Sequence, residues 1–259
     1  PVELAQSHED GVWWLGHASV LLQLDGNIIL TDPVFSRRAS PLPFLGPQRK
    51  TPPVLSVEQL HQLDAVVISH NHYDHLDDAT IRKILKRFPD VCCFVPLGLA
   101  DWFRRRGAKR VVELDWWQSF TWQGMTLTAV PAQHWSMRTP WNRNRSLWCG
   151  WVMEGRYHRF WFSGDTGYSP ELLLIPERLG QIDAAALPIG AYAPRWFMAV
   201  HHMDPQSAVA LWQQLGCPLA FPIHWGVFEL ADEALDEPVQ ELRSEEHTLN
   251  SSHTVESRM

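Results

Sequence analysis

The chain has 259 residues, 45% of them hydrophobic, and a formal net charge of −7 at pH 7. This length suits one large domain with a substantial core. No apolar run approaches the roughly 20 residues that cross a bilayer, and the acidic balance argues against nucleic-acid binding as the main task. Four cysteines (Cys92, Cys93, Cys149 and Cys217) lack disulfide-framework spacing. We expect buried free thiols, which fit a reducing, cytoplasmic compartment.

The first part of the chain predicts strands. Three are expected at 12–15, 19–24 and 27–31, and Asp25-Gly26 between the last two is a strong hairpin signal. A Pro-rich stretch at 41–53 indicates a loop. Ser56, with Gln59 three residues later, indicates the start of a helix that would end near residue 63.

The remainder of the chain alternates helices and strands. In chain order we predict a strand at 64–69, a helix at 78–88, a strand at 91–95, a helix at 97–106, a strand at 110–114, mostly strands from 120 to 162, and helices at 170–179 and 204–215. Asp204 is a good N-cap for the last helix, and Pro205 suits its first turn. This pattern predicts two sheets with helices outside, an α/β (α+β) fold.

The loop after the strand at 64–69 carries a dense cluster of metal-binding side chains. Residues 70–75 read His-Asn-His-Tyr-Asp-His. Burying such groups at a strand end is costly unless something compensates, and a divalent metal would do so. His70 and His72 alternate, so an extended loop aims both at one ion, and Asp74 and His75 can face a second ion. A polar surface loop rich in His is the plainer alternative, which later residues argue against.

Three further strand ends carry a ligand-type side chain: His134 follows 125–130, Asp165 follows an apolar strand ending near 162, and His224 follows a short apolar run. The candidate metal ligands are therefore His70, His72, Asp74, His75, His134, Asp165 and His224. They are too many for one tetrahedral ion and suit two ions that share a bridging carboxylate. Imidazole and carboxylate without thiolate favour zinc, with Mn²⁺ or Fe²⁺ as alternatives.

These motifs resemble those of the metallo-β-lactamase superfamily, whose signature is His-x-His-x-Asp-His with a distal His, Asp and His. Within it, the chain is similar to the N-acyl phosphatidylethanolamine-hydrolysing phospholipase D family and its bacterial relatives. The resemblance extends from about residue 11 to 229 and rests on the segments Trp14-Leu-Gly-His-Ala-Ser19, Thr31-Asp-Pro-Val-Phe-Ser36, His70-Asn-His-Tyr-Asp-His-Leu-Asp77, Pro131-Ala-Gln-His-Trp135, Gly164-Asp-Thr-Gly-Tyr168, Pro188-Ile-Gly-Ala-Tyr192, Pro194-Arg-Trp-Phe-Met198 and Ile223-His-Trp-Gly226.

The resemblance implies a four-layer αββα metallo-β-lactamase sandwich with metals at one edge between the sheets. It also implies two Zn²⁺ per chain. One ion would be held by His70, His72 and His134, and the other by Asp74, His75 and His224, with Asp165 as the bridge. The implied activity is that of a binuclear zinc hydrolase, a phosphodiesterase of phospholipase D type that acts on N-acylated phosphatidylethanolamine-like lipids.

Two further residues are candidates for catalytic roles beside Asp74 and Asp165. Asp32, in Thr-Asp-Pro, would orient the metal loop, although a turn cap before Pro33 is an equal alternative. His202 would stabilise charge on the substrate or act as an acid, and packing before the helix N-cap is its equal alternative. His17 is expected to be structural.

A loop at 136–146 follows His134 directly and contains Trp141, Arg138, Arg143 and Arg145. It is expected to form a lid or groove wall for an amphipathic, anionic substrate, either a phospholipid or a small phosphodiester. Tryptophan also favours membrane interfaces, so peripheral contact with the inner membrane face is a further expectation. The sequence does not indicate the oligomeric state.

Alternative functions remain open at this point. A lactonase or acyl hydrolase would use the same metals, and substrate choice lies in loops. A di-iron redox protein is disfavoured because a Glu would replace the second His of the motif, where position 72 is His. A non-catalytic scaffold would require lost ligands, and none is lost.

The domain is expected to span residues 1–242. Residues 243–259 are polar without periodicity, so we expect a disordered or non-native tail whose His247 and His253 are not ligands. Similar proteins continue with a further helix and strand, which suggests a truncated or frameshifted end. The chain begins at Pro1, so an upstream segment is also expected.

Overall fold

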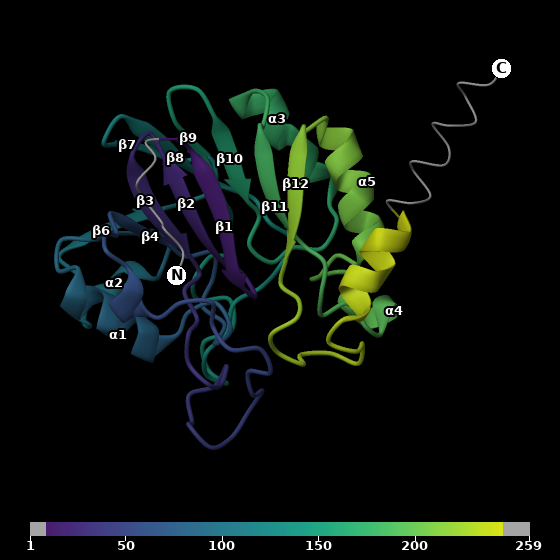
Figure 1. Cartoon of the computed structure of the whole chain (residues 1–259), viewed down its shortest axis with the longest axis horizontal. Coiled ribbons are helices and arrows are strands. Elements are labelled where there is room, and N and C mark those ends of the chain that lie inside the picture. Colours follow the sequence, from purple (N-terminus) through teal and green to yellow (C-terminus); the bar gives the residue numbers. More distant parts are fainter. Residues whose placement is uncertain (1–8, 246–259) are drawn as a thin grey trace.

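The computed structural model describes residues 9–245, which form two six-stranded mixed sheets packed face to face (Figure 1). The first sheet contains β1 (Gly11–Gly16), β2 (Ser19–Leu24), β3 (Asn27–Thr31), β4 (Ala65–Val67), β5 (Cys92–Pro96) and β6 (Arg110–Leu114). The second contains β7 (Ser119–Trp122), β8 (Met125–Val130), β9 (Gly150–Glu154), β10 (Arg159–Phe162), β11 (Ala184–Pro188) and β12 (Leu219–Ile223).

Both sheets are built in the same way. Each begins with antiparallel neighbours, β1 to β3 in the first sheet and β7 to β10 in the second. Each then continues with parallel strands to its other edge, through β6 in the first and β12 in the second. The two halves therefore share an architecture, although no internal sequence repeat is visible.

Helices cover the outer faces of the sheets. The helical elements are η1 (Val57–Gln59), α1 (Asp78–Arg87), α2 (Ala100–Arg104), η2 (Pro170–Leu173), α3 (Leu174–Leu179), α4 (Arg195–Met198) and α5 (Pro205–Leu215). Residues 237–245 form a last helical segment. No helix among residues 9–245 is long and apolar enough to span a bilayer.

Alternating side chains of each strand enter two different cores. In β4, Ala65 and Val67 pack between the sheets, whereas Val66 packs under α1 and α2. In β10, Phe162 lies between the sheets and Trp161 packs against the helices of the second half. Because both faces of the inner strands such as β2, β4, β5 and β9 are buried, these strands read as apolar runs rather than as half-polar alternation. The predicted four-layer αββα sandwich is confirmed.

Most predicted elements are present, with differences where packing outweighs local signals. Asp204 accepts a hydrogen bond from the backbone of Ser207, as expected for the N-cap of α5. The capping box at Ser56 is present, but it begins only the three-residue η1, since the backbone at Leu60 is already extended. Strand β11 was not predicted. Its alanine-rich sequence has weak strand propensity, and its pairing between β10 and β12 decides its conformation.

The predicted boundary at residue 242 falls inside a helix. Residues 243–245 continue the helical segment that begins at 237, and Leu242 packs against the outer core of the second sheet. The polar sequence after Leu242 carries no apolar periodicity, which is why sequence patterning ended the ordered part there. The rest of the predicted tail, residues 246–259, lies outside the described residues.

Trp151 of β9 joins the two sheets beneath the loop at 70–75. Its indole is fully buried, and its Nε1 donates a 2.8 Å hydrogen bond to the carbonyl of Ile68 in the facing sheet. We expect Trp151→Phe to lower the free energy of unfolding by about 1–3 kcal/mol, because the buried carbonyl would lose its partner. Urea denaturation measures the change.

The matched control is Trp141→Phe, since Trp141 is 83% exposed. It should change the free energy of unfolding by less than about 0.5 kcal/mol. Equal effects of the two substitutions would contradict the role of the inter-sheet hydrogen bond.

Candidate metal centre

The ligand-type side chains meet where loops leave the strands of both sheets. The loop after β4 carries His70 to His75, and single residues follow the ends of β8, β10 and β12. Adjacent parallel strands end at the same sheet edge, so side chains distant in sequence converge there. All seven predicted ligands are brought together, and the exposed fractions of His70, His75, His134, Asp165 and His224 are 5% or less.

Three histidines form the first group. His70 Nε2 and His72 Nδ1 are 2.8 Å apart, and His134 Nε2 lies 3.2 Å from the same His72 atom. Nitrogen ligands of one tetrahedral zinc lie about 3.3 Å from each other, given Zn–N bonds of about 2.0–2.1 Å. The spacing of these nitrogens therefore fits a shared ion.

The second group is centred on Asp74. Its Oδ2 lies 3.3 Å from His75 Nε2 and 3.2 Å from His224 Nε2. His17 Nε2 contacts the same oxygen at 3.0 Å. Sequence reasoning assigned His17 a structural role, yet it is fully buried within this group. Its position in the Gly-His-Ala-Ser turn after β1 was the only sequence signal for it.

Asp165 lies between the two groups. Its Oδ2 is 3.1 Å from both His75 Nε2 and His224 Nε2, and 3.7 Å from His134 Nε2. Its Oδ1 is buried without a hydrogen-bond partner among residues 9–245, and His75 Nε2 is buried against the carboxylates of Asp165 and Asp74. Buried polar atoms of this kind are costly unless they meet a ligand. The donor set, its spacing and these atoms together fit metal ions.

The charges of the two groups differ. Burial lowers the pKa of His70 and His134 well below the usual range and that of His72 to about 4, so these rings are neutral and suited to bind a metal. Burial also acts on His224, but Asp165 and Asp74 outweigh it and raise the pKa of His224 to about 9. An ion that joins the second group must therefore displace protons.

The carboxylates of the site remain ionised. Burial alone would raise the pKa of Asp74, but the charge of His75 and hydrogen bonds with His17 and His224 hold it well below the usual range. The pKa of Asp165 is lowered in the same way, with the charges of His224 and His75 outweighing burial. Two negative carboxylates thus face the imidazoles in a buried space, a distribution that suits divalent cations.

A surrounding layer of hydrogen bonds orients the rings. Asp32 is fully buried and contacts His75 Nδ1 at 2.6 Å, while its other oxygen accepts from the backbone N–H of Ser69 at 2.7 Å. The carbonyl of His201 lies 3.0 Å from His134 Nδ1. Partners of this kind fix the tautomer so that Nε2 faces the metal. Asp32 is thus placed to orient the metal loop.

His202 lies at the edge of the first group, where it forms a further candidate metal-holding set with His134 and Asp165. Its Nδ1 is 3.9 Å from Asp165 Oδ2, and the residue lines the adjoining cleft. Burial lowers the pKa of His202 to about 3, so the ring is neutral near pH 7. A group in this position faces the cleft and also lies beside His134 and Asp165.

An open cleft of about 410 Å³ leads to the metal groups. One side presents Asp74, Asp165 and His202. The other sides are largely apolar, formed by residues Ala39, Trp135, Met137, Pro140, Ala191, Met198 and Leu230. The predicted lid at 136–146 supplies part of this wall, and Arg143 stacks over Trp135 at its base, 5.0 Å from the ring centroid. The cleft therefore suits an amphipathic substrate.

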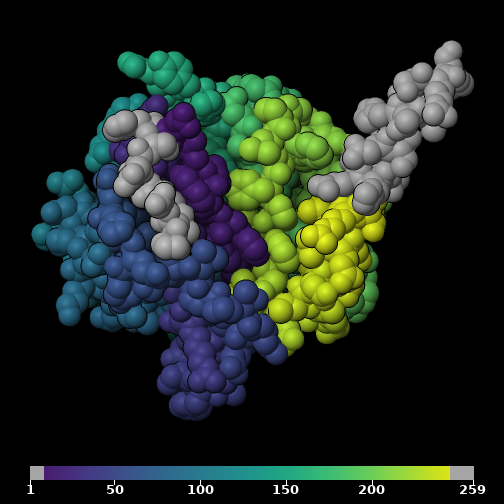
Figure 2. Space-filling view, in the orientation of Figure 1, coloured from purple at the N-terminus to yellow at the C-terminus, as the bar shows by residue number. Residues whose placement is uncertain are grey.

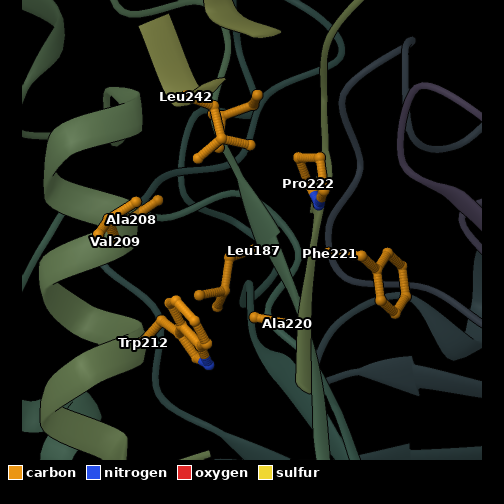
Figure 3. Close-up of a pocket in the computed structure, with 9 residues that line it drawn as sticks. Leu187, Ala208, Val209, Trp212, Ala220, Phe221, Pro222 and Leu242 are labelled. Atoms are coloured by element: carbon orange, nitrogen blue, oxygen red, sulfur yellow. The ribbon is translucent and has the colours of Figure 1, made fainter. Parts of the chain in front are cut away.

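A separate apolar hollow lies between α5 and β12 (Figure 3). Trp212 and Val209 from the helix face Ala220 and Pro222 of the strand across it, and Leu242 closes one end. None of its nine lining residues is titratable, and none is a candidate metal ligand. This hollow therefore lacks the ionisable and metal-binding side chains that a metal-dependent reaction requires.

Comparisons with known proteins agree with this geometry. Residues 27–225 match the family model described as the beta-lactamase superfamily domain. The chain is 44% identical over 227 residues to the N-acyl-phosphatidylethanolamine-hydrolyzing phospholipase D 1 of Caenorhabditis elegans, which covers 84% of this chain and 64% of that protein. The mitochondrial N-acyl-phosphatidylethanolamine-hydrolyzing phospholipase D of Saccharomyces cerevisiae is 33% identical over 236 residues, 88% of this chain and 50% of that protein.

Thus the chain spans less than two thirds of the length of these two curated relatives. Among solved structures, a metallo hydrolase from the archaeon Ignicoccus hospitalis matches with a TM-score of 0.69 and 22% identity, covering 91% of both chains. These findings confirm the predicted fold and the predicted family resemblance.

Asp165→Asn tests whether this carboxylate serves both groups. The amide keeps the shape but removes the negative charge, so we expect metal retention to fall by at least about tenfold and turnover by orders of magnitude. Circular dichroism should show an intact fold. Metal content after dialysis gives the measurement.

The control is Asp101→Asn on α2, where the carboxylate side chain is 75% exposed and pairs with Arg104. This variant should keep wild-type metal content. Full metal occupancy in Asp165→Asn would rule out the bridging role.

Proposed function

The chain belongs to the beta-lactamase superfamily, and we propose that it is a binuclear zinc hydrolase, a phosphodiesterase of phospholipase D type that acts on N-acylated phosphatidylethanolamine-like lipids. The observation that carries the binuclear proposal is the position of Asp165. One oxygen of this carboxylate lies 3.1 Å from two histidines of the Asp74 group and 3.7 Å from a histidine of the other group. A shared carboxylate is what two neighbouring ions require.

His70, His72 and His134 would hold one zinc, and Asp74, His75 and His224 the other. Bound there, the two ions would activate a water nucleophile and stabilise the negative charge that develops on phosphoryl oxygens. His17 would hold the orientation of Asp74 through their 3.0 Å contact. Asp32 would fix the ring of His75 through its 2.6 Å contact.

His202 would contact the substrate itself. Its ring lines the cleft close to Asp165 and is neutral near pH 7 because burial lowers its pKa to about 3. A neutral imidazole donates one hydrogen bond without carrying charge. We therefore assign His202 as a hydrogen-bond partner of the phosphoryl group rather than as a charged acid.

The cleft favours a lipid over a small polar substrate. Its apolar wall from Trp135, Met137 and Met198 would contact acyl chains, and its ionisable floor would receive the phosphodiester. The names of the relatives from C. elegans and S. cerevisiae support the same substrate class. The leaving group would be an N-acylethanolamine and the lipid product a phosphatidic acid.

Exposed apolar side chains near the cleft support peripheral contact with a membrane. Trp141 follows the cleft residue Pro140, and Phe197 precedes the cleft residue Met198. Trp141 is 83% exposed and Phe197 62%. Trp196, which directly precedes Phe197 in α4, is also exposed. Large aromatic groups of this kind favour the lipid–water interface, so they would bring the cleft to its substrate.

A lactonase or acyl hydrolase is the second candidate. The same ligand groups would activate a nucleophile against a carbonyl carbon, and nothing in the ligand set separates the two reactions. The observation that favours the phosphodiesterase is the combination of an apolar cleft wall with the positive charge of Arg143, which stacks over the cleft residue Trp135, because this charge would attract a phosphate.

Metal content tests the binuclear proposal. Protein purified without added metal should contain about two equivalents of zinc by elemental analysis, because two separate donor groups are present. Chelation should remove the activity, and zinc should restore it. A folded sample with less than one equivalent that takes up no zinc on titration would overturn the proposal.

Substrate preference tests the reaction. Zinc-replete enzyme should release phosphatidic acid from N-acylated phosphatidylethanolamine, measured by chromatography of the lipid products, and should act poorly on lactones. Arg143→Ala with Arg145→Ala should weaken action on micellar lipid more than on a small soluble phosphodiester. Brisk lactone hydrolysis without lipid cleavage would support the second candidate instead.

A further inference from the structure

A second polar hollow lies beside the metal cleft. It has a volume of about 490 Å³ and sits between the segment 36–43 and the start of α1. We call it the basic hollow because four arginines line it, Arg37, Arg38, Arg106 and Arg138. Tyr73 and Arg138 also line the cleft, so the two spaces share a wall.

The two carboxylates of the basic hollow are already engaged. Asp78 pairs with Arg82 at 2.8 Å and with Arg106. Asp77 accepts hydrogen bonds from the backbone of Ser36 at 2.9 Å, from the backbone of Ala79 at 3.1 Å and from the hydroxyl of Thr80. Neither carboxylate forms an ion pair with Arg37, Arg38 or Arg138 among the described residues, although the charges of both act on Arg138 and oppose the lowering of its pKa by burial.

Three of the arginines have no carboxylate partner among residues 9–245. Arg38 donates only to neutral acceptors, the carbonyl of Gly46 at 2.6 Å and the side chain of Gln48 at 3.3 Å. Arg37 is exposed and has neither a hydrogen bond nor an ion pair from its side chain to the described residues. The basic hollow is therefore positive in a chain whose net charge is −7.

Arg138 is the most constrained of the three. Its guanidinium donates to the carbonyls of Asn71 at 2.8 Å and Leu76 at 2.7 Å, and it stacks over Tyr73, 4.0 Å from the ring centroid. Burial lowers its pKa from the usual value. A largely buried cation without a carboxylate partner is costly, and an anion in the basic hollow would offset that penalty.

An apolar loop tip adjoins these charges. Leu42 and Pro43 line the basic hollow, and the neighbouring Phe44 and Leu45 are 74% and 61% exposed. In Figure 2 this part of the chain protrudes from the lower end of the molecule. Apolar side chains beside arginines match a membrane surface, where acyl chains lie just below anionic phosphates.

We propose that the basic hollow binds the phosphate group of an anionic phospholipid in a membrane surface, at a site separate from the cleft. The exposed Arg37 and the guanidinium of Arg138 would contact the phosphate from two sides, a geometry that arginine suits well. The loop tip at 42–45 would enter the apolar layer beside that lipid. This inference rests on the contact with lipid in the proposed function, and it concerns binding rather than turnover.

The test compares two charge reversals in the zinc-loaded full chain. Arg37→Glu changes the basic hollow, whereas Arg156→Glu changes an exposed arginine in the turn between β9 and β10 whose side chain has no carboxylate partner within 9–245 either. Binding is measured by pelleting with vesicles of phosphatidylcholine alone, and of phosphatidylcholine with phosphatidylglycerol in equal amounts. Turnover of a soluble phosphodiester monitors the integrity of the cleft.

We expect wild type and Arg156→Glu to prefer the anionic vesicles, and Arg37→Glu to lose on the order of tenfold in partitioning, because each basic residue near such a surface contributes about a factor of five. The difference should shrink at high salt. Equal binding by the two variants, or no preference for anionic vesicles in wild type, would overturn the proposal.

Calorimetry with inorganic phosphate distinguishes the source of the phosphate. A lipid ligand would be contradicted if Arg37→Glu abolished the binding of free phosphate while the variants bound vesicles equally. Normal vesicle binding with no turnover of any phosphodiester would instead count against the proposed function and leave this site in place.

Discussion

The structure depends on balancing the buried charges at one edge of the two-sheet sandwich. Asp74 and Asp165 remain ionised there with 3.0–3.3 Å contacts to imidazoles. Burying an isolated carboxylate costs several kcal/mol of desolvation free energy. Pairing with a cation offsets this cost only when the other polar atoms of the pair also have hydrogen-bond partners. The Oδ1 of Asp165 has no hydrogen-bond partner among residues 9–245, so the described protein groups leave this balance incomplete. Divalent ions would complete it, and this requirement explains why so many other contacts orient the rings.

Hydrophobic packing elsewhere in the molecule stabilises the fold and offsets the free-energy cost of this buried charged site. Both sheets have two buried apolar faces, so three hydrophobic layers stabilise the fold independently of the edge. Trp151 then ties the second sheet to the carbonyl of Ile68, two residues before His70. The rigid strands therefore set the positions of the metal ligands, while loops such as 136–146 form the cleft wall. The apolar part of the cleft wall and the ligand-type side chains therefore come largely from different segments of the chain.

The sequence predicted the fold and the ligand-type residues because their signals are local. Apolar runs end in clusters such as residues 70–75, and parallel strands bring those ends together. His17 was predicted to be structural because, although the segment Trp14–Ser19 carries the family resemblance, a single histidine in a turn does not show that its ring reaches Asp74. Its contact with Asp74 depends on a pairing across 57 residues. Strand β11 was missed because alanines gain strand conformation only from tertiary burial. The basic hollow also had no sequence signal, since its arginines come from three separate segments.

The central claim is that two ions share Asp165. Anomalous diffraction at the zinc edge from crystals of the metal-replete protein tests it most directly. We expect two peaks about 3.5–4 Å apart, one beside His70, His72 and His134 and the other beside Asp74 and His224, with the Asp165 carboxylate between them. A single peak in crystals grown with excess zinc, or two peaks that Asp165 does not contact, would contradict it.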